Sequence, residues 1–225
     1  MNLYALFKER IIVTMEVVVR LAVADDLAEL EQLDRICFPP GDPHRDVSEP
    51  GEIKTGVADG RIFLAETAAS QDIRMAAYLY YHTDPTQLHY FVVGIGVHPS
   101  CRAQGLGVRL INTLVTMVKN SSQRELVDIA MTVSPYNIAM LKVAFQCGFA
   151  VTDYVANYFG HGRDRFYLLR DESLAQEASR RRLLIPLSAV EQTYEFLRDA
   201  AVFIVGVEAL PHGQCFVLSE RRRNN

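Results

Sequence analysis

Residues 91–110, FVVGIGVHPSCRAQGLGVRL, constrain the fold of this chain more than any other stretch. Residues 91–97 are an apolar run rich in valine and isoleucine, with the length of a buried strand. From Leu106 onward apolar residues recur at three- and four-residue spacing, which predicts a helix to about Lys119. A buried strand, a glycine-containing turn and an amphipathic helix are therefore expected to follow one another directly.

The turn between this strand and this helix is typical of an anion-binding site. Gly105 and Gly107 let the backbone approach a ligand, and N–H groups at a helix start point outward. Such a turn suits a phosphate or pyrophosphate. Two common phosphate motifs are excluded. A dinucleotide motif needs a third glycine where Leu110 stands, and the Gly-Lys-Ser/Thr of a P-loop is absent.

Length and composition predict one globular domain with at most a small appendage. The chain has 225 residues, 49% of them hydrophobic, which is enough to bury a core. A net charge of −4 argues against a nucleic-acid partner. The four cysteines lack metal-ligand spacing, so no metal and a reducing compartment are expected. No apolar run has the length of a membrane span and residues 1–14 lack a signal-peptide core, which together predict a cytoplasmic protein without a membrane partner.

Apolar patterning predicts the remaining elements of residues 16–170. Strands are expected at 16–23, 61–66, 75–81, 88–97, 126–133 and 165–170. A helix is expected from Asp25 or Asp26 to just before Phe38, a weak one at 52–58, and another after Asn137 that stops at Gly148. The strands at 88–97 and 126–133 flank the long helix and should form a parallel unit with a right-handed crossover.

Two motifs resemble the GNAT family of N-acetyltransferases. Arg102-x-x-Gly105-x-Gly107 behind a strand ending Val97-His-Pro resembles the family's acetyl-coenzyme A loop. The series Asn137, Ala139, Leu141, Gly148 and Phe149 matches, in order and spacing, the pattern that follows the family's second core strand. The resemblance covers residues 17–170. It implies an α/β GNAT fold, with a mixed, mostly antiparallel sheet and a parallel strand–helix–strand unit at the coenzyme site.

The resemblance also implies where acetyl-coenzyme A would bind. The loop amides would take the pyrophosphate, and the backbone of the preceding strand would hold the pantetheine arm and polarise the acetyl carbonyl. The expected contacts are Ile95, Gly96, Val97, Arg102, Ala103, Gln104, Gly105, Leu106, Gly107, Val108, Asn137, Ala144 and Phe145. Gly94 and Gly96 fit either a bulge with close ligand approach or a plain packing constraint.

A closer resemblance is to the branch that acetylates protein N-terminal amines, including the RimI-type enzymes. It is carried by Cys37-Phe38-Pro39 and by residues 157–164, NYFGHGRD. In that branch the corresponding loops flank the acceptor peptide, which implies acceptor contacts at Phe38, Pro39, Tyr158 and Phe159. Ordinary packing beside a turn explains Tyr158 and Phe159 equally well.

The sequence departs from the family where proton transfer is concerned. The family's tyrosine acid falls on Ala144, and the glutamate base of RimI-type enzymes falls on Thr132. Tyr158 and His89 are the candidate replacements. The expected activity is direct acetyl transfer to a primary amine, a peptide α-amine or a small molecule, without metal or covalent intermediate. The rival expectation is a catalytically inactive acyl-coenzyme A-binding or regulatory module.

Outside the resemblance, residues 1–15 are expected to be an extension and residues 171–225 an ordered appendage to the 16–170 domain. Helices are predicted at 173–184 and, from a Ser188/Glu191 capping box, at 188–200. A hairpin is predicted from strands at 201–207 and 215–219. Because a lone hairpin is marginal in water, this one should cover the core or join a second subunit, giving a homodimer.

Overall fold

A computed structural model describes residues 17–42, 51–67, 73–84, 89–120, 128–170, 178–190, 202–211 and 213–221, with residues 193, 195 and 197 between the last segments. Its described strands are β1 (Val17–Leu21), β2 (Ile62–Thr67), β3 (Met75–Asp84), β4 (His89–Val97), β5 (Ile129–Val133), β6 (Ala150–Val155), β7 (Arg165–Arg170), β8 (Ala178–Pro186), β9 (Val202–Leu210) and β10 (Gly213–Arg221). Its described helices are α1 (Leu27–Cys37), α2 (Glu52–Ala58), α3 (Leu106–Asn120) and α4 (Ile138–Gln146). The predicted order of elements through residue 149 is confirmed.

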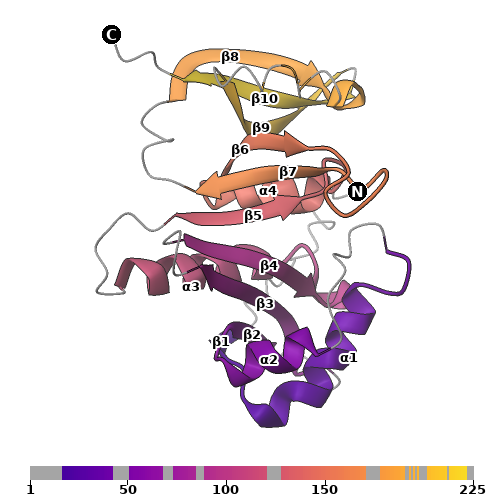
Figure 1. The fold of residues 1–225 in the computed structure, drawn as a ribbon, viewed down its shortest axis with the longest axis vertical. Coiled ribbons are helices and arrows are strands. Elements are labelled where there is room, and N and C mark those ends of the chain that lie inside the picture. The colour runs from indigo at the N-terminus through magenta and orange to yellow at the C-terminus, as the bar shows by residue number, and fades with distance from the viewer. Residues whose placement is uncertain are drawn as a thin grey trace, which may run out of the picture.

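One sheet runs the length of the described molecule (Figure 1), in the order β1-β2-β3-β4-β5-β7-β6-β9-β10-β8. Every pairing between the described strands is antiparallel except that of β4 with β5, which run parallel on either side of the α3 crossover. This is the α/β fold with a parallel strand–helix–strand unit that the sequence predicts. The strand β6 was not predicted.

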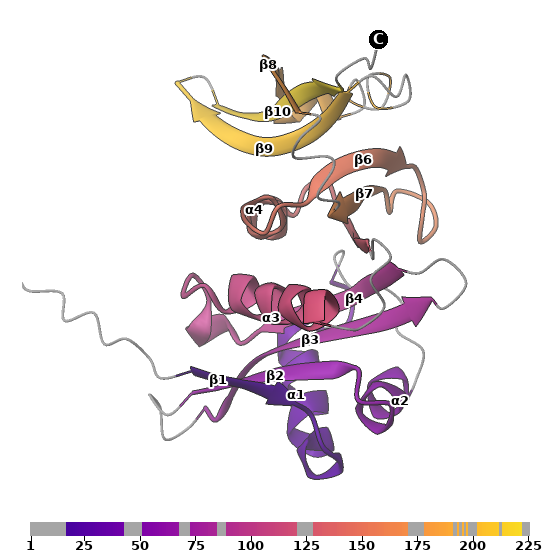
Figure 2. The same ribbon diagram turned by 90° about the vertical axis from the view of Figure 1, so that its left-hand side faces the viewer.

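Two hydrophobic clusters lie on opposite faces of the first strands (Figure 2). On one face Leu30 and Leu33 of α1 pack with Tyr78 and Tyr80 of β3. On the other face α3 packs against Leu79 and Tyr81 of the same strand, because successive strand residues point to opposite sides. The tyrosines Tyr78 and Tyr80 therefore lie under α1 and α2, away from the long helix.

The parallel pair β4–β5 is short, and this opens the sheet. Its register runs only from Tyr90–Val92 opposite Ile129–Met131, although β4 continues to Val97. Just beyond, the β3–β4 register shifts between Tyr80 opposite Gly94 and Tyr81 opposite Val92, leaving Val93 as a bulge. The far half of β4 thus has β3 on one side and, among the described strands, no ladder partner on the side of β5.

Both helices beside this opening begin or end at residues that the sequence singles out. Ala103 and Gly105 adopt left-handed conformations, with φ of +59° and +77°, in the turn before α3. The side chain of Asn137 caps α4 by accepting a hydrogen bond from the N–H of Met140 at 3.1 Å. Gly148, at φ +84°, ends that helix as predicted.

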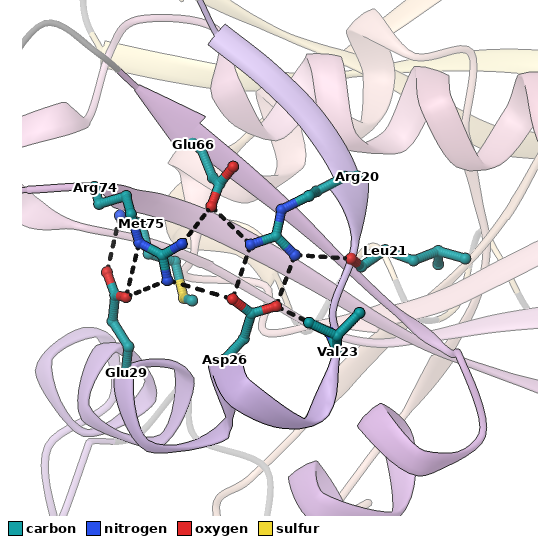
Figure 3. A network of polar contacts seen from close by, with 8 residues as sticks. All are labelled: Arg20, Leu21, Val23, Asp26, Glu29, Glu66, Arg74 and Met75. Carbon is teal, nitrogen blue, oxygen red and sulfur yellow. Dashed lines mark hydrogen bonds and ion pairs between the residues drawn. The ribbon is translucent and has the colours of Figure 1, made fainter.

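A network of charged side chains fixes the start of α1 to the sheet (Figure 3). Arg20 of β1 binds Asp26 at 2.6 Å and Glu66 of β2 at 2.7 Å, and Arg74 binds Glu29 of α1 at 2.6 Å. The Asp26 side chain is only 3% exposed, and the Arg20 guanidinium holds the pKa of that carboxyl well below its usual range. Three elements distant in sequence are therefore joined around one buried carboxylate.

The appendage differs in one element from the prediction. The hairpin is confirmed as β9 and β10, and the described residues 190, 193, 195 and 197 are helical, within the helix predicted at 188–200. The predicted helix at 173–184 is wrong, since residues 178–186 form strand β8 (residues 171–177 and Glu191 lie outside the described residues). Alanine, arginine and leucine favour a helix locally, but antiparallel pairing with β10, Leu183 opposite Leu218 and Ile185 opposite Phe216, outweighs that preference.

The appendage extends the core sheet rather than standing apart from it. Strand β9 meets β6 through the pair Val151 and Ile204, both fully buried. The rings of Phe166 on β7 and Phe216 on β10 also meet, edge to face, with centroids 5.4 Å apart. The expectation that the appendage covers an edge of the core therefore agrees with the described contacts.

Candidate active site

A pocket of about 430 Å³ opens where β4 and β5 diverge. Its turn end is lined by residues of the turn before α3 and of α4: Cys101, Arg102, Ala103, Gly105, Leu106, Gly107, Asn137, Ala139, Met140 and Val143. Its carboxylate end is lined by Asp34, Cys37, Phe38, Asp42, Glu52, Ile53, Tyr78 and Tyr80. The pocket is completed by residues of β4 and β5 and by Arg165. One cavity thus connects the anion-binding turn with three carboxylates.

The turn end has the backbone geometry of an anion site. Gly105 adopts a left-handed conformation and nothing would lie within 4 Å of a Cβ there, so the space beside it is open. A Cβ at Gly107 would lie 3.4 Å from Val143, an ordinary contact distance, so α3 packs beside α4 at this glycine. The Arg102 side chain donates to the carbonyl of Val97 at 3.2 Å and ties the turn to the end of β4.

The two glycines of β4 have different roles. A Cβ on Gly96 would lie 2.3 Å from the ring of Tyr78, its cross-strand partner, so this glycine is required by packing. Gly94 faces Tyr80 across the ladder, yet a Cβ there would meet nothing within 4 Å. Of the two explanations that the sequence left open, packing accounts for Gly96, and open pocket space accounts for Gly94.

The carboxylate end is fixed by buried polar groups. The Tyr78 hydroxyl donates to Asp34 of α1 at 2.5 Å. Arg165 is only 2% exposed, donates to the carbonyl of Asp164 at 2.9 Å and lies 4.9 Å from the ring centre of Phe159. Burial raises the pKa of the Cys37 thiol to about 12, so this pocket cysteine stays protonated and is no nucleophile at neutral pH.

The pocket includes many, but not all, of the residues predicted for the site. Ile95, Val97, Arg102, Ala103, Gly105, Leu106, Gly107, Asn137 and Phe38 line it. Gly96, Gln104, Val108, Pro39 and Ala144 lie next to lining residues in the chain without lining it themselves, and Phe145 lies two residues beyond the lining residue Val143. The residue Thr132, which replaces the expected glutamate, is a lining residue, whereas Ala144 is fully buried in the core.

The two candidate catalytic residues lie outside this pocket. His89 is the first residue of β4, at the opposite end of the strand from Val97. Tyr158 lies in the turn between β6 and β7, is 44% exposed and packs edge-on against Phe159. Phe159 approaches the pocket only through Arg165. Sequence reasoning missed Glu52, Tyr78 and Tyr80, although strand alternation along 75–81 places both tyrosines on one face.

The fold and this pocket define the class: a mixed sheet opened at one parallel strand pair, with an anion-binding turn at the opening. The chain belongs to the acetyltransferase (GNAT) family, whose model matches residues 27–149, over half of its 225 residues. No curated protein sequence matches the chain.

Solved structures of several acetyltransferases share the fold. Naa50 of Arabidopsis thaliana, in complex with a CoA-Ac-MVNAL bisubstrate analogue, is 20% identical over 69% of this chain and 98% of its own, with a TM-score of 0.56. The ribosomal-protein-S18-alanine N-acetyltransferase of Escherichia coli is 18% identical over 69% and 93%, with a TM-score of 0.52. Diaminobutyrate acetyltransferase EctA of Paenibacillus lautus, bound to diaminobutyric acid and coenzyme A, is 19% identical over 70% and 96%, with a TM-score of 0.53.

The described residues contain neither a candidate membrane-spanning helix nor a candidate metal-binding group. None of the helices they form has both the length and the apolar character needed to cross a membrane. No group of three or more histidine, cysteine, aspartate or glutamate side chains in the described segments is placed to hold a metal ion.

Proposed function

We propose that this protein transfers the acetyl group of acetyl-coenzyme A to a primary amine, by direct attack of the amine within a ternary complex. The observation that carries the proposal is the single pocket that connects the anion-binding turn with a carboxylate-lined end along the open edge of β4. A donor with an anionic pyrophosphate fits the first end, and an acceptor that arrives as an ammonium ion fits the second.

The coenzyme would lie along residues that are already held in place. Backbone N–H groups of residues 102–108 would take the pyrophosphate at the start of α3. The part of β4 beyond Val92, unpaired on the side of β5, would hold the pantetheine arm as an added strand. Open space at Gly94 leaves room for the thioester beside the Val93 bulge. Asn137, which lines the pocket at the start of α4, would contact the arm from the other side.

The preferred acceptor in this proposal is a peptide N-terminal α-amine, flanked by Phe38, Pro39, Tyr158 and Phe159. Only a neutral amine attacks a thioester, and an α-amine with a pKa of about 7.7–8.0 is neutral at pH 7 far more often than a lysine near 10.4. Naa50 is seen with a peptide-bearing analogue and EctA with a small diamine, so relatives of this fold take both kinds of acceptor. A small-molecule amine is the second acceptor class.

A coenzyme-binding module without activity is the second candidate function. It is favoured by the two departures from the family: Ala144 is fully buried and Thr132 carries no carboxylate. Both candidates predict coenzyme binding, so binding does not separate them. General acid–base assistance is typically worth about 10² to 10⁴ in rate, whereas orientation can supply roughly 7–11 kcal/mol, so an enzyme without these two groups is still effective.

The experiment is release of free coenzyme A from acetyl-coenzyme A in the presence of peptides and small amines. The panel contains free-α-amine peptides, the same peptides with a blocked N-terminus and an internal lysine, and small diamines. The proposal expects turnover with at least one free-amine acceptor, and fastest with the α-amine peptides. Coenzyme binding without turnover of any acceptor supports the inactive module, and equal rates on blocked lysine peptides contradict the α-amine preference.

A further inference from the structure

Four polar side chains, from α2, β3 and the connection between α2 and β2, meet at the carboxylate end of the pocket. Glu52 and Tyr80 line the pocket, while His82, two residues beyond Tyr80 on the same face of β3, is 41% exposed at its rim. The Tyr80 hydroxyl lies 3.2 Å from His82 Nε2, and Glu52 Oε1 lies 3.5 Å from the same nitrogen. Arg61 Nη1 lies 3.1 Å from the other ring nitrogen, Nδ1.

These contacts decide which nitrogen of His82 carries hydrogen. A guanidinium can only donate, so Nδ1 beside Arg61 must accept, and the hydrogen of the neutral imidazole then lies on Nε2. That single N–H faces both the Tyr80 oxygen and the Glu52 carboxylate. Arg61 is itself held in place by an ion pair with Asp59. With this tautomer, His82 presents its N–H to the Tyr80 hydroxyl, and the Glu52 carboxylate lies 3.5 Å from the same nitrogen.

We propose that Glu52 is the base that takes the proton of the acceptor ammonium, and that His82 and Tyr80 are positioning residues that orient its carboxylate. This inference rests on the proposed function. The glutamate base of the RimI-type enzymes that this chain resembles falls on Thr132. A carboxylate base must therefore come from another element. Asp34 is already bound to Tyr78 at 2.5 Å. Glu52, the first residue of α2, lines the same cavity and lies 3.5 Å from Nε2 of His82.

The proton and electron balance of the step is simple. The ammonium gives one proton to the Glu52 carboxylate, and its freed electron pair attacks the thioester carbon. The nitrogen pair becomes the new carbon–nitrogen bond, the carbon–sulfur bond breaks, and the thiolate leaves with the electron pair of the broken bond. The amide nitrogen loses a second proton, one proton returns to the sulfur, and one is released to water. Glu52 can release its proton directly to water, because its side chain is 23% exposed.

The electrostatics of the cluster fit this assignment. Tyr80 and His82 from β3 lie beside Glu52, and Arg61, which contacts His82, pairs with Asp59 in the connection between α2 and β2. Burial, with the nearby Glu52 charge as a second cause, raises the pKa of Tyr80. The phenol therefore stays protonated at neutral pH and serves as a hydrogen-bonding group, not as the base.

The test compares Glu52→Gln with Glu31→Gln, a control on α1 outside the pocket, using acceptor amines of graded pKa at one pH. We expect kcat/KM of Glu52→Gln to fall by about 10² to 10⁴, with coenzyme affinity unchanged. The fall should grow with the pKa of the amine, because the variant can use only the fraction that is already neutral. His82→Gln and Tyr80→Phe should reduce kcat less, while Tyr81→Phe, on the opposite face of β3, should match the wild type.

The outcomes separate this inference from the proposed function. A wild type that acetylates no amine contradicts the proposed function and, with it, the role of Glu52. An active wild type with an unaffected Glu52→Gln variant contradicts only the role of Glu52. A loss confined to KM, or equal for every amine, also contradicts it, since Glu52 would then bind the acceptor without taking its proton.

Discussion

At the scale of single residues, the two glycines of β4 show how one residue type serves two purposes. Gly96 is excluded from carrying a side chain by the Tyr78 ring, whereas Gly94 faces open space in the pocket. Tyr78 is in turn fixed by its hydrogen bond to Asp34, so its ring cannot move aside without breaking that contact. The strand is therefore rigid at one glycine and accessible at the next.

A matched pair of substitutions follows from this difference. Gly96→Ala should lower the free energy of unfolding by about 1–3 kcal/mol, the usual range for overpacking a core. Gly94→Ala should leave that free energy nearly unchanged and reduce acetyl transfer, because its methyl group occupies the space proposed for the thioester. Urea unfolding and thioester turnover measure the two effects. Equal stability of both variants would mean that the Tyr78 ring relaxes freely.

Gly105 is the residue of the turn where left-handed geometry and open space coincide. Gly105→Val should weaken coenzyme A binding by at least about tenfold, since a β-branched side chain strains the turn and fills the space beside its N–H groups. Gly60→Val is the control, because Gly60 also has a positive φ and open space but lies beyond α2, outside the pocket. Calorimetry that finds unchanged affinity in a folded Gly105→Val protein would place the coenzyme elsewhere.

At the scale of elements, patterns confined to one strand or helix could be predicted from the sequence. The valine-rich run at 91–97 predicted β4, and the three- and four-residue spacing of apolar residues after Gly105 predicted α3. Gly148 predicted the end of α4. Strand β6 was missed because it follows directly on Phe149 without a turn residue between them. Strand β8 was missed because its conformation depends on β10, which lies far along the chain.

The site was predicted unevenly for the same reason. The turn end could be predicted because a contiguous stretch forms it. The cluster of Glu52, Tyr80 and His82 could not, because it depends on how α2 packs on β3, and neither spacing nor a local motif encodes that contact. His89 and Tyr158, which were singled out by residue type alone, lie away from the pocket and stay predictions that the same turnover assay can test.

The charged network around Asp26 is a further property of elements, since it joins β1, β2 and α1. Asp26→Asn should lower the free energy of unfolding at pH 7 by about 1–2 kcal/mol, a range reduced because Arg20 is partly exposed. The pKa of Asp26 is lowered in the folded state, so its contribution is present above the unfolded pKa of about 3.9 and is lost as the pH falls below it. Urea midpoints at pH 7 and pH 3 measure both effects.

The neighbouring aspartate supplies the control. Asp25→Asn, an exposed residue of the same turn, should change neither the midpoint nor its pH dependence. If Asp26→Asn loses as much stability between pH 7 and pH 3 as the wild type does, other carboxylates are responsible for the acid sensitivity.

At the scale of the whole molecule, the appendage is part of the sheet, so its removal should lower the stability of the core. Truncation after Arg170 would uncover β6 and the Phe166 ring, which now contact β9 and Phe216. We expect a lower melting temperature and a tendency to associate, because an uncovered strand edge offers unpaired N–H and C=O groups. Light scattering and thermal melting measure this. A monodisperse truncated protein with the same melting temperature would show that the core needs no such cover.

Because β4 pairs with β5 only over Tyr90–Val92, the rest of β4 can pair with a ligand, and this has a thermodynamic consequence. A ligand that binds only the folded chain shifts the folding equilibrium in its favour, by about 2.7 kcal/mol at a concentration one hundred times its dissociation constant. For a chain of this size that corresponds to an increase of roughly 5–10 °C in melting temperature. Coenzyme A should therefore stabilise the folded chain against thermal unfolding, and the same concentration of coenzyme A should raise the melting temperature of the Gly105→Val protein clearly less than that of the wild type.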